Sequence, residues 1–395
     1  FPARFGSRLS SVIDVGIREG DYDHYHAGAT IGILSSKIHA EGPLEQGKSS
    51  FIIAARMSYL DLFVQPVIIK LADNTGTLSS FSNMNYYDIN AKLTRKFSER
   101  DKLSAVFYLG KDVAITAPTD SRQQFFLELY NYNSLSYKSD RTENRWGNMV
   151  SSIYWTRIIS DRINSNVNFS YSNYQYRLKM SSVVENEITD QNIDKRLSYY
   201  YENSRAVYNS GITDISLAGD INFVPGDLHH VRCGGKISTQ HFTPTVDAYK
   251  YVLTEDLEPG GEYFITENTT DTLLGKTNGL HTIAIYSEDD FSAGENLKFN
   301  TGLRYTLFIV KGKAWHSLEP RLSGRLLLSD AMALKASFSL MQQGIHLLSS
   351  NNLVMPSDIW VPVTKMFAPM KSYQFAAGIN FTSVKEVGVS LEGYY

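Results

Sequence analysis

Residues 297–309 alternate between apolar and polar side chains along the chain. The alternation sets one parity against the other: Leu297, Phe299, Thr301, Leu303, Tyr305, Leu307 and Ile309 against Lys298, Asn300, Gly302, Arg304 and Thr306. Because successive side chains of a strand point to opposite faces, one face of this segment suits hydrocarbon and the other suits water. About a dozen such segments recur, joined by short polar turns on one side and long connections on the other, which is typical of a transmembrane antiparallel β-barrel.

The short turns are rich in Gly, Pro, Ser or charged residues, which favour tight reversals of the chain. They fall near 42–47, 98–102, 160–162, 224–227, 292–295, 328–331 and 384–386. The segments that they join predict about fourteen strands, each long enough to cross a bilayer at a tilt: 25–40, 49–63, 86–97, 103–115, 146–159, 163–176, 213–223, 229–240, 281–290, 297–309, 318–327, 332–343, 373–381 and 387–395. We expect the longer connections to be extracellular loops: 64–84, 117–145, 181–204, 242–277 and 348–371.

The composition indicates one all-β architecture. No linker or shift of composition divides the 395 residues into separate domains, and the net charge of -3 argues against nucleic acid as a partner. No run approaches the roughly 18 apolar residues that a membrane helix needs. The single cysteine, Cys233, excludes an intramolecular disulfide, and its apolar neighbours on the same strand face predict that it faces lipid. The start of the chain lacks the pattern of a signal peptide, so we expect further residues upstream.

Four segments resemble TonB-dependent outer-membrane receptors of the Bacteroidetes type, in the order in which they occur in that family. Residues 1–15 resemble the end of the plug domain, and the sequences EGP at 41–43 and RMSYLD at 56–61 resemble the first barrel hairpin. The other two resemble paired-strand motifs of the same receptors: 319–323 with 334–339, and 346–350 with 356–362 and 369–372.

The resemblance implies an importer in the bacterial outer membrane. Residues 1–20 would form the C-terminal end of a plug domain, and 21–395 would form about fourteen strands of a barrel of roughly 22, the rest following Tyr395. Such receptors import a scarce nutrient, a siderophore, glycan, peptide or cofactor, with energy from the TonB–ExbB–ExbD complex, and some work with a surface lipoprotein. Outer-membrane lipid is a further implied partner. In many of these receptors an inward glutamate after Lys-Ser holds the plug, but Ala376 stands at that position here.

Charged residues of the polar strand face are candidates for contacts between the plug and the barrel. Glu319, Arg321 and Arg325 share this parity, and Arg8 and Asp14 lie on the plug segment. Buried charges need partners, so ion pairs between the two groups would hold the plug in place. Hydrated lumen charges without a special role are the alternative, and the sequence leaves both open.

Aromatic residues of the long connections are candidates for ligand contacts at the pore mouth: Tyr199, Tyr200, Tyr201, Phe125, Phe126, Tyr130 and Trp360. Aromatic faces there could stack on a sugar ring, a catechol or a haem edge. An outer aromatic girdle with packing between loops is the alternative that we favour, because barrels concentrate aromatic rings at the membrane interface.

The sequence predicts no catalytic site, no metal site and no cofactor. No Gly-x-Ser-x-Gly motif occurs, and the histidines lack the spacing of a metal-ligand set. The alternatives to a gated importer are a passive porin, a surface adhesin or display scaffold, and, with least support, a membrane-embedded hydrolase. The strand parity further predicts that Leu303→Arg impairs assembly much more than Thr306→Arg, because the first places a charge in lipid and the second places it in the lumen.

Overall fold

The computed structural model describes residues 2–9, 12–59, 61–62, 66, 70, 84–257, 263–275, 277–348, 359–384 and 387–395. The strands of the described chain are β1 (His26–Ile31), β2 (Ser35–Glu45), β3 (Ser49–Ser58), β4 (Met84–Ser98), β5 (Asp101–Leu127), β6 (Tyr132–Ser160), β7 (Ile163–Asp190), β8 (Lys195–Gly226), β9 (His229–Phe242), β10 (Thr245–Leu257), β11 (Tyr263–Gly275), β12 (Asn278–Ala293), β13 (Leu297–Val310), β14 (Lys313–Ser329), β15 (Met332–Gln343), β16 (Ile345–Leu348), β17 (Ile359–Pro362), β18 (Met370–Val384) and β19 (Val387–Tyr394). In this part of the chain no helix has the length and the apolar character needed to span a membrane.

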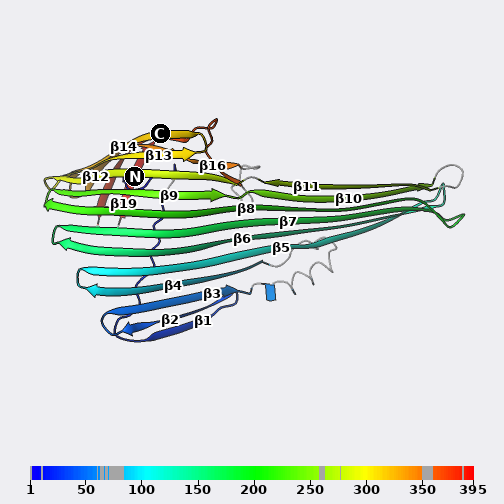
Figure 1. Ribbon diagram of the computed structural model, residues 1–395, viewed down its shortest axis with the longest axis horizontal. Helices are drawn as coiled ribbons and strands as arrows, with labels where there is room; N and C mark the ends of the chain where they lie inside the picture. The colour runs from blue at the N-terminus through cyan, green and yellow to red at the C-terminus, as the bar shows by residue number, and fades with distance from the viewer. Residues whose placement is uncertain are drawn as a thin grey trace.

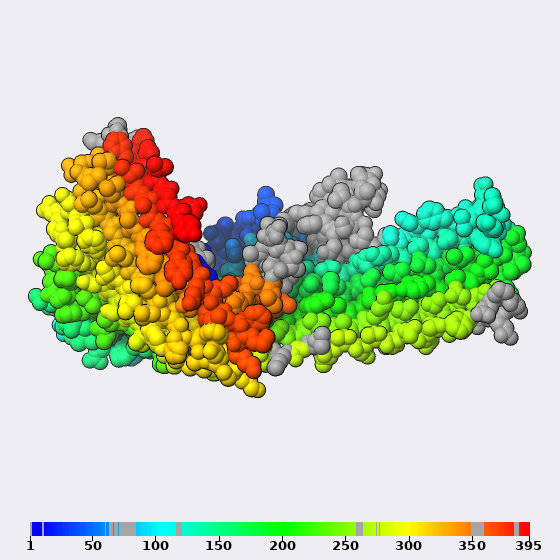
Figure 2. All heavy atoms as spheres, turned by 90° about the horizontal axis from the view of Figure 1, so that it is seen from above, coloured from blue at the N-terminus to red at the C-terminus, as the bar shows by residue number. Residues whose placement is uncertain are grey.

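Antiparallel pairing joins neighbouring strands into one 17-stranded sheet within the described residues. Apart from β1, β10 and β11, its members are the about fourteen strands that the alternation predicts. Figure 1 shows the short turns together at one end of the sheet. Figure 2 shows that the sheet curls at this end into a partial barrel, in which the C-terminal strands turn back toward the N-terminal ones. The fold class predicted from the sequence, a transmembrane antiparallel β-barrel, is confirmed.

The expected parity of the strand faces is confirmed on β13. Leu303 is 48% exposed on the outer face, whereas its neighbours Arg304 and Thr306 are 3% and 0% exposed on the inner face. We call this inner face the lumen face. On β9, Cys233 is exposed on the outer face, as predicted, and its Sγ lies 3.1 Å from the Ser287 hydroxyl.

The prediction of long extracellular loops is wrong for three of the five segments. Residues 117–145, 181–204 and 242–277 lie mostly in strands, because β5 to β8 are 27 to 32 residues long and continue past the barrel. At about 3.3 Å per residue such strands reach roughly 90 Å, about three times the hydrocarbon thickness. The sequence missed the extensions because polar residues occupy both of their faces, so the two-residue apolar period disappears while backbone pairing persists.

The extensions form a blade that projects from the barrel (Figures 1 and 2). On one side β10 takes over from β9 as the partner of β8, and β11 pairs with β10. Pro244, which has no backbone N–H, stands where β9 ends and β10 begins. A six-stranded sheet outside the membrane therefore replaces the expected loops.

Several expectations fall on residues outside the description. These are most of the connection 64–84, part of 348–371, residues 385–386 of the last turn, and, within the resembling segments, positions 1, 10–11, 60, 349–350 and 356–358. The segment 25–40, expected as one strand, instead forms the hairpin of β1 and β2, with a reversal at 32–34.

A small apolar cluster closes part of the lumen near the blade. It comprises Phe242, Leu280, Phe308, Val310, Ile345 and Val363, all at most 8% exposed. Trp360 of β17 packs against this cluster, so its ring does not project freely at the pore mouth as the sequence suggested.

Candidate functional site

The N-terminal segment, described at residues 2–9 and 12–20, crosses the lumen face of the sheet. In Figure 1 it runs from the N label beside β9 and β12 down to β2. Hydrogen bonds join its residues to strands far apart in sequence, from Arg4 on Glu288 of β12 to Ile17, whose carbonyl accepts a bond from Lys92 of β4. The segment is therefore held at both ends across many strands, and it obstructs part of the lumen.

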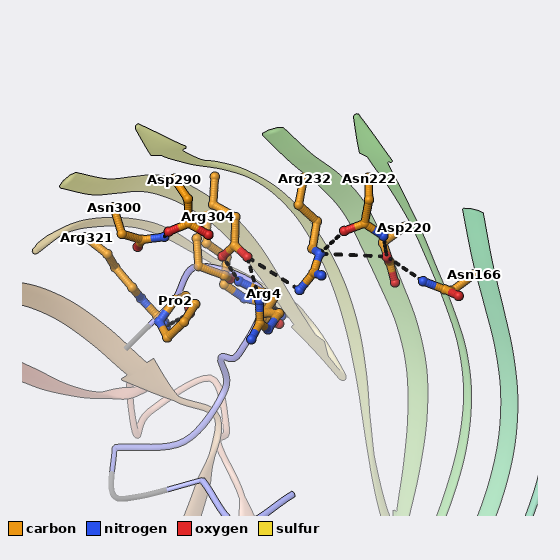
Figure 3. A network of polar contacts seen from close by, with 12 residues as sticks. Pro2, Arg4, Asn166, Asp220, Asn222, Arg232, Asp290, Asn300, Arg304 and Arg321 are labelled. Atoms are coloured by element: carbon orange, nitrogen blue, oxygen red, sulfur yellow. Dashed lines mark hydrogen bonds and ion pairs between the residues drawn. The ribbon is translucent and has the colours of Figure 1, made fainter. Parts of the chain in front are cut away.

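A buried carboxylate on β12 holds the start of the segment. The backbone N–H of Arg4 donates to Glu288 Oε2 at 3.0 Å, and Arg4 Nη1 lies 3.1 Å from Glu288 Oε1. The Glu288 side chain is 2% exposed, and a second cation, Arg232 Nη1, lies 3.8 Å from the same oxygen. Figure 3 shows that Arg232 also reaches Asn222 and Asp220 on β8. Glu288 is therefore compensated by one cation from the segment and one from the barrel wall.

Two arginines of the barrel wall bind backbone carbonyls of the same segment. Arg304 Nη1 donates to the carbonyls of Ala3 and Arg4 at 3.3 and 3.2 Å, and Arg321 Nη1 donates to the carbonyl of Pro2 at 2.7 Å. Contacts to backbone carbonyl groups depend on the backbone conformation of the segment and not on the identity of its side chains. Arg304 and Arg321, which we call the arginine wall, therefore fix the position of the segment in the lumen.

Glu319 on β14 holds Arg321 of the arginine wall in position. Its Oε2 accepts a bond from Arg321 Nη2 at 3.0 Å, and its Oε1 accepts bonds from the hydroxyls of Thr306 and Ser317 at 2.9 and 3.1 Å. The side chains of Arg321 and Glu319 are 1% and 0% exposed. A fully buried pair of this kind needs every lone pair satisfied, and the two hydroxyls supply those bonds.

The middle and the end of the segment have their own contacts with the wall. Leu9 donates through its N–H to Gln343 Oε1 at 3.3 Å and accepts through its carbonyl from Gln374 Nε2 at 3.2 Å. Farther on, Arg18 forms an ion pair with Glu41 of β2, and Glu19 forms one with Lys102 of β5 at 2.7 Å. The segment is thus bonded to the sheet at its start, at Leu9 and near its end.

The loop after the segment lies at the short-turn end of the barrel, outside the membrane-spanning strands. Backbone N–H groups of Asp23 and His24 donate to the Asp21 carboxylate and lower its pKa to about 2. Burial and the hydrogen bond to Glu19 raise the pKa of Tyr22 to about 12. Both groups therefore keep their charge state across the physiological range.

The structure brings together only some of the residues that the sequence proposed for this role. Arg321 and Glu319 lie at the segment, but Asp14 is exposed, and in the described part of the chain the Arg8 side chain donates only to the carbonyl of its neighbour Ser7. Arg325 does not reach the segment in the described part of the chain, and its Nε lacks a partner there.

The sequence reasoning missed seven described residues that contact the segment: Glu288, Arg304, Gln343, Gln374, Glu41, Lys92 and Lys102. Arg304 had been placed on the lumen face, but no sequence signal showed that its guanidinium meets the carbonyls of Ala3 and Arg4. Glu288 could have been found from its lumen parity on β12, as Glu319 was on β14.

Five of the aromatic candidates lie in strands of the blade and not in loops, whereas Tyr130 lies in the turn between β5 and β6. Tyr199, Tyr200 and Tyr201 belong to β8, and Phe125 and Phe126 belong to β5. Tyr199 donates to Glu185 Oε1 at 3.0 Å, and burial followed by this bond raises its pKa to about 12. The Tyr201 ring lies 6.1 Å from the Tyr251 ring across the strands.

The exposed aromatic rings gather at the far end of the blade. Phe125, Phe126 and Tyr130 are 59%, 55% and 61% exposed, and Tyr130 stacks on Tyr132 with centroids 5.7 Å apart. This end is far from the lumen segment, so the structure separates the aromatic candidates into a distant group and Trp360. Within the described residues, no group of three or more His, Cys, Asp or Glu is placed to hold a metal ion.

Residues 72–395 match the family described as TonB dependent receptor-like, beta-barrel. The chain belongs to this family of TonB-dependent receptors. It is therefore an outer-membrane protein, and the relatedness that four short segments indicated is confirmed. No curated protein matches the sequence.

Solved receptors share the fold of this TonB-dependent receptor barrel. The siderophore receptor PiuA from Acinetobacter baumannii superposes with a TM-score of 0.51 at 13% identity, over 95% of this chain and 56% of that chain. The RagAB peptide transporter superposes with a TM-score of 0.51 at 8% identity, over 91% of this chain and 44% of that chain. The chain thus spans about half the length of these receptors, and at such identities the likeness shows the fold alone.

Proposed function

We propose that the chain is part of a gated importer, in which residues 1–20 end a plug domain and 21–395 form barrel wall and blade. The observation that supports this most is the bonding of the N-terminal segment to the lumen face through its carbonyls, by Arg304 and Arg321. A passive porin needs an open lumen, and a segment fixed across the wall obstructs it. The energy for release would come from the TonB–ExbB–ExbD complex.

The nutrient belongs to one of the small-molecule or oligomeric classes that such receptors import. The similar structures are a siderophore receptor and a peptide transporter, and the fold alone does not choose between these classes. Under this proposal Arg8, Asp14, Glu319, Arg321 and Arg325 remain candidates for plug contacts, and the aromatic group of the blade remains a candidate for ligand capture.

Two measurements on the full-length protein test the gated importer. In planar lipid bilayers its conductance should be near zero, and a large, steady open channel would instead favour a porin. In cells, uptake of siderophore and peptide nutrients should depend on TonB. Equal uptake with and without TonB would contradict the proposal.

The blade favours a second role, the binding of a partner at the cell surface. Six strands extend beyond the membrane and carry exposed aromatic rings at their end, including Phe125, Phe126 and Tyr130. A surface lipoprotein is the partner that fits an importer, whereas an adhesin or display scaffold would use the same blade without import. Replacing 119–139 and 181–204 by short turns should abolish uptake if the blade serves import, and should leave it unchanged if the blade only displays or adheres.

A further inference from the structure

A cavity of about 370 Å³ lies between the N-terminal segment and the wall formed by β8, β9 and β12 to β16. This volume falls at the lower end of the range for small-molecule sites in proteins. Arg4, Phe5, Arg8 and Val12 of the segment form one side, and the other side includes Lys236, Arg304 and Arg321. The cavity is therefore a space that the segment itself helps to close.

Cations outnumber carboxylates around this cavity. Arg4 and Arg321 have ion-pair partners in Glu288 and Glu319. Among the described residues, Arg8, Lys236 and Arg304 have no carboxylate within 4.0 Å, although Asp214 also lines the space.

The Asp214 carboxylate is already engaged by another group: Gln240 Nε2 donates to its Oδ2 at 2.5 Å. With Asp214 as the single remaining acid for Arg8, Lys236 and Arg304, two positive charges are in excess. Arg304 is 3% exposed, and a buried charge is costly unless an anion or water compensates it, whereas Arg8 and Lys236 are exposed and free to meet a ligand.

Arg321 supplies an independent observation that points to an anionic ligand. Its side chain is 1% exposed and lines the cavity, and its Nε has no hydrogen-bond partner among the described residues. A buried guanidinium N–H without an acceptor is unfavourable, because a buried donor keeps its full cost of desolvation. An anion in the cavity would supply both an acceptor and the compensating charge.

The opposite wall of the cavity is apolar. Leu280 and Phe308, each 1% exposed, and Ile345, which is 4% exposed, belong to the apolar cluster of the lumen and also line this cavity. Met341, 2% exposed, adds a flexible thioether side chain to the same wall. One side of the cavity thus suits an anionic group, and the other suits a hydrocarbon or aromatic body.

We propose that this cavity binds a small amphiphilic carboxylate. Its head would lie among Arg8, Lys236, Arg304 and Arg321, and its apolar body would lie against Leu280 and Phe308. The proposal rests on the proposed import function in one respect, because it names such a carboxylate as the class of nutrient that passes this point. The binding itself requires no transport. It can therefore be measured on the receptor in the absence of TonB.

Calorimetry on the full-length receptor in lipid nanodiscs, with empty nanodiscs as the blank, tests the site with three probes. Hydrocinnamate carries both a carboxylate and a ring, hydrocinnamide has the ring without the charge, and propanoate has the charge without the ring. We expect saturable binding of hydrocinnamate that is at least about tenfold tighter than that of either other probe, since each lacks one half of the recognition.

Matched variants locate the binding. Lys236→Gln and Arg8→Gln should each weaken hydrocinnamate binding about tenfold, because each removes one charged contact. Among the described residues, neither side chain forms a hydrogen bond or ion pair that holds the segment to the wall. Lys298→Gln is the control, since Lys298 shares the lumen parity but lines a separate cavity with Arg325 and Lys335. It should leave the affinity unchanged.

Three outcomes would overturn the site. These are no saturable binding of hydrocinnamate, equal binding of hydrocinnamide, or equal weakening by Lys298→Gln, which would show diffuse attraction to a basic lumen. Binding as expected, together with uptake that is independent of TonB, would retain the site and refute the import proposal. Absent binding with TonB-dependent uptake of another nutrient would do the reverse.

Discussion

Replacing Glu319 by Gln should destabilise the barrel by about 3 kcal/mol. The Gln carbonyl can take the place of Oε1 and keep the bonds from Thr306 and Ser317, but its amide would face the Arg321 guanidinium, donor against donor. Breaking a buried ion pair costs about 3 to 5 kcal/mol. We expect the lower value because Arg321 keeps its bond to the carbonyl of Pro2 at 2.7 Å.

Urea unfolding of the full-length protein in detergent, followed by tryptophan fluorescence, measures this cost. With a urea dependence of about 3 kcal/mol per M, the midpoint should fall by about 1 M. Lys48→Gln is the matched control, because the Lys48–Glu45 pair is 65% and 42% exposed and should contribute less than about 1 kcal/mol.

A double-mutant cycle of Glu319→Gln with Arg321→Met isolates the pair. The double variant should be less destabilised than the sum of the two single variants, because the second change removes the unpaired charge that the first leaves behind. If Glu319→Gln shifts the midpoint no more than Lys48→Gln does, the reasoning from burial is refuted.

Two further predictions follow from the strand faces and the blade. Leu303→Arg should lower the stability of the barrel by about 2 to 4 kcal/mol and reduce the yield of folded protein, because it places a charge in lipid. Ala376→Arg, on the lumen face beside a cavity, should have little effect on stability. Equal yields of the two variants would contradict the assigned parity. Burial and Glu185 raise the pKa of Tyr199 to about 12, so an ultraviolet titration compared with Tyr199→Phe should show one phenol titrating near that value, and Glu185→Gln should lower it. Because the folded pKa lies above the usual value of about 10, the stabilisation is complete below about pH 10 and is lost as the pH rises to about 12; a Tyr199 that titrates near 10 would contradict the burial.

The structure changes the control that the sequence suggested for the first of these tests. Thr306 has the lumen parity, but it is 0% exposed and bonds Glu319. The new side chain of Thr306→Arg would clash with the arginine wall and would not reach solvent in the lumen. Parity alone shows which face a residue occupies, and it does not show what already fills that face.

The sequence by itself determined the antiparallel barrel, the positions of most of its barrel strands and the two faces of a strand such as β13. It could do so because a strand between lipid and a polar lumen must alternate apolar and polar side chains. This two-residue period is a property of neighbouring residues, such as Leu303 and Arg304. The turns are also local, since a tight reversal needs Gly, Pro or short polar residues at the reversal itself.

Only the tertiary structure decided the blade, the path of the N-terminal segment and the groups that hold it. Strands that leave the membrane lose the need for an apolar face, so β5 to β8 continue on backbone pairing that the side-chain pattern does not report. The contact of Arg304 with the carbonyls of Ala3 and Arg4 joins residues about 300 positions apart, and backbone carbonyls leave no trace in a sequence. The same holds for the cavity charges, because whether Arg8 and Lys236 have partners depends on three-dimensional distances that no spacing along the chain encodes.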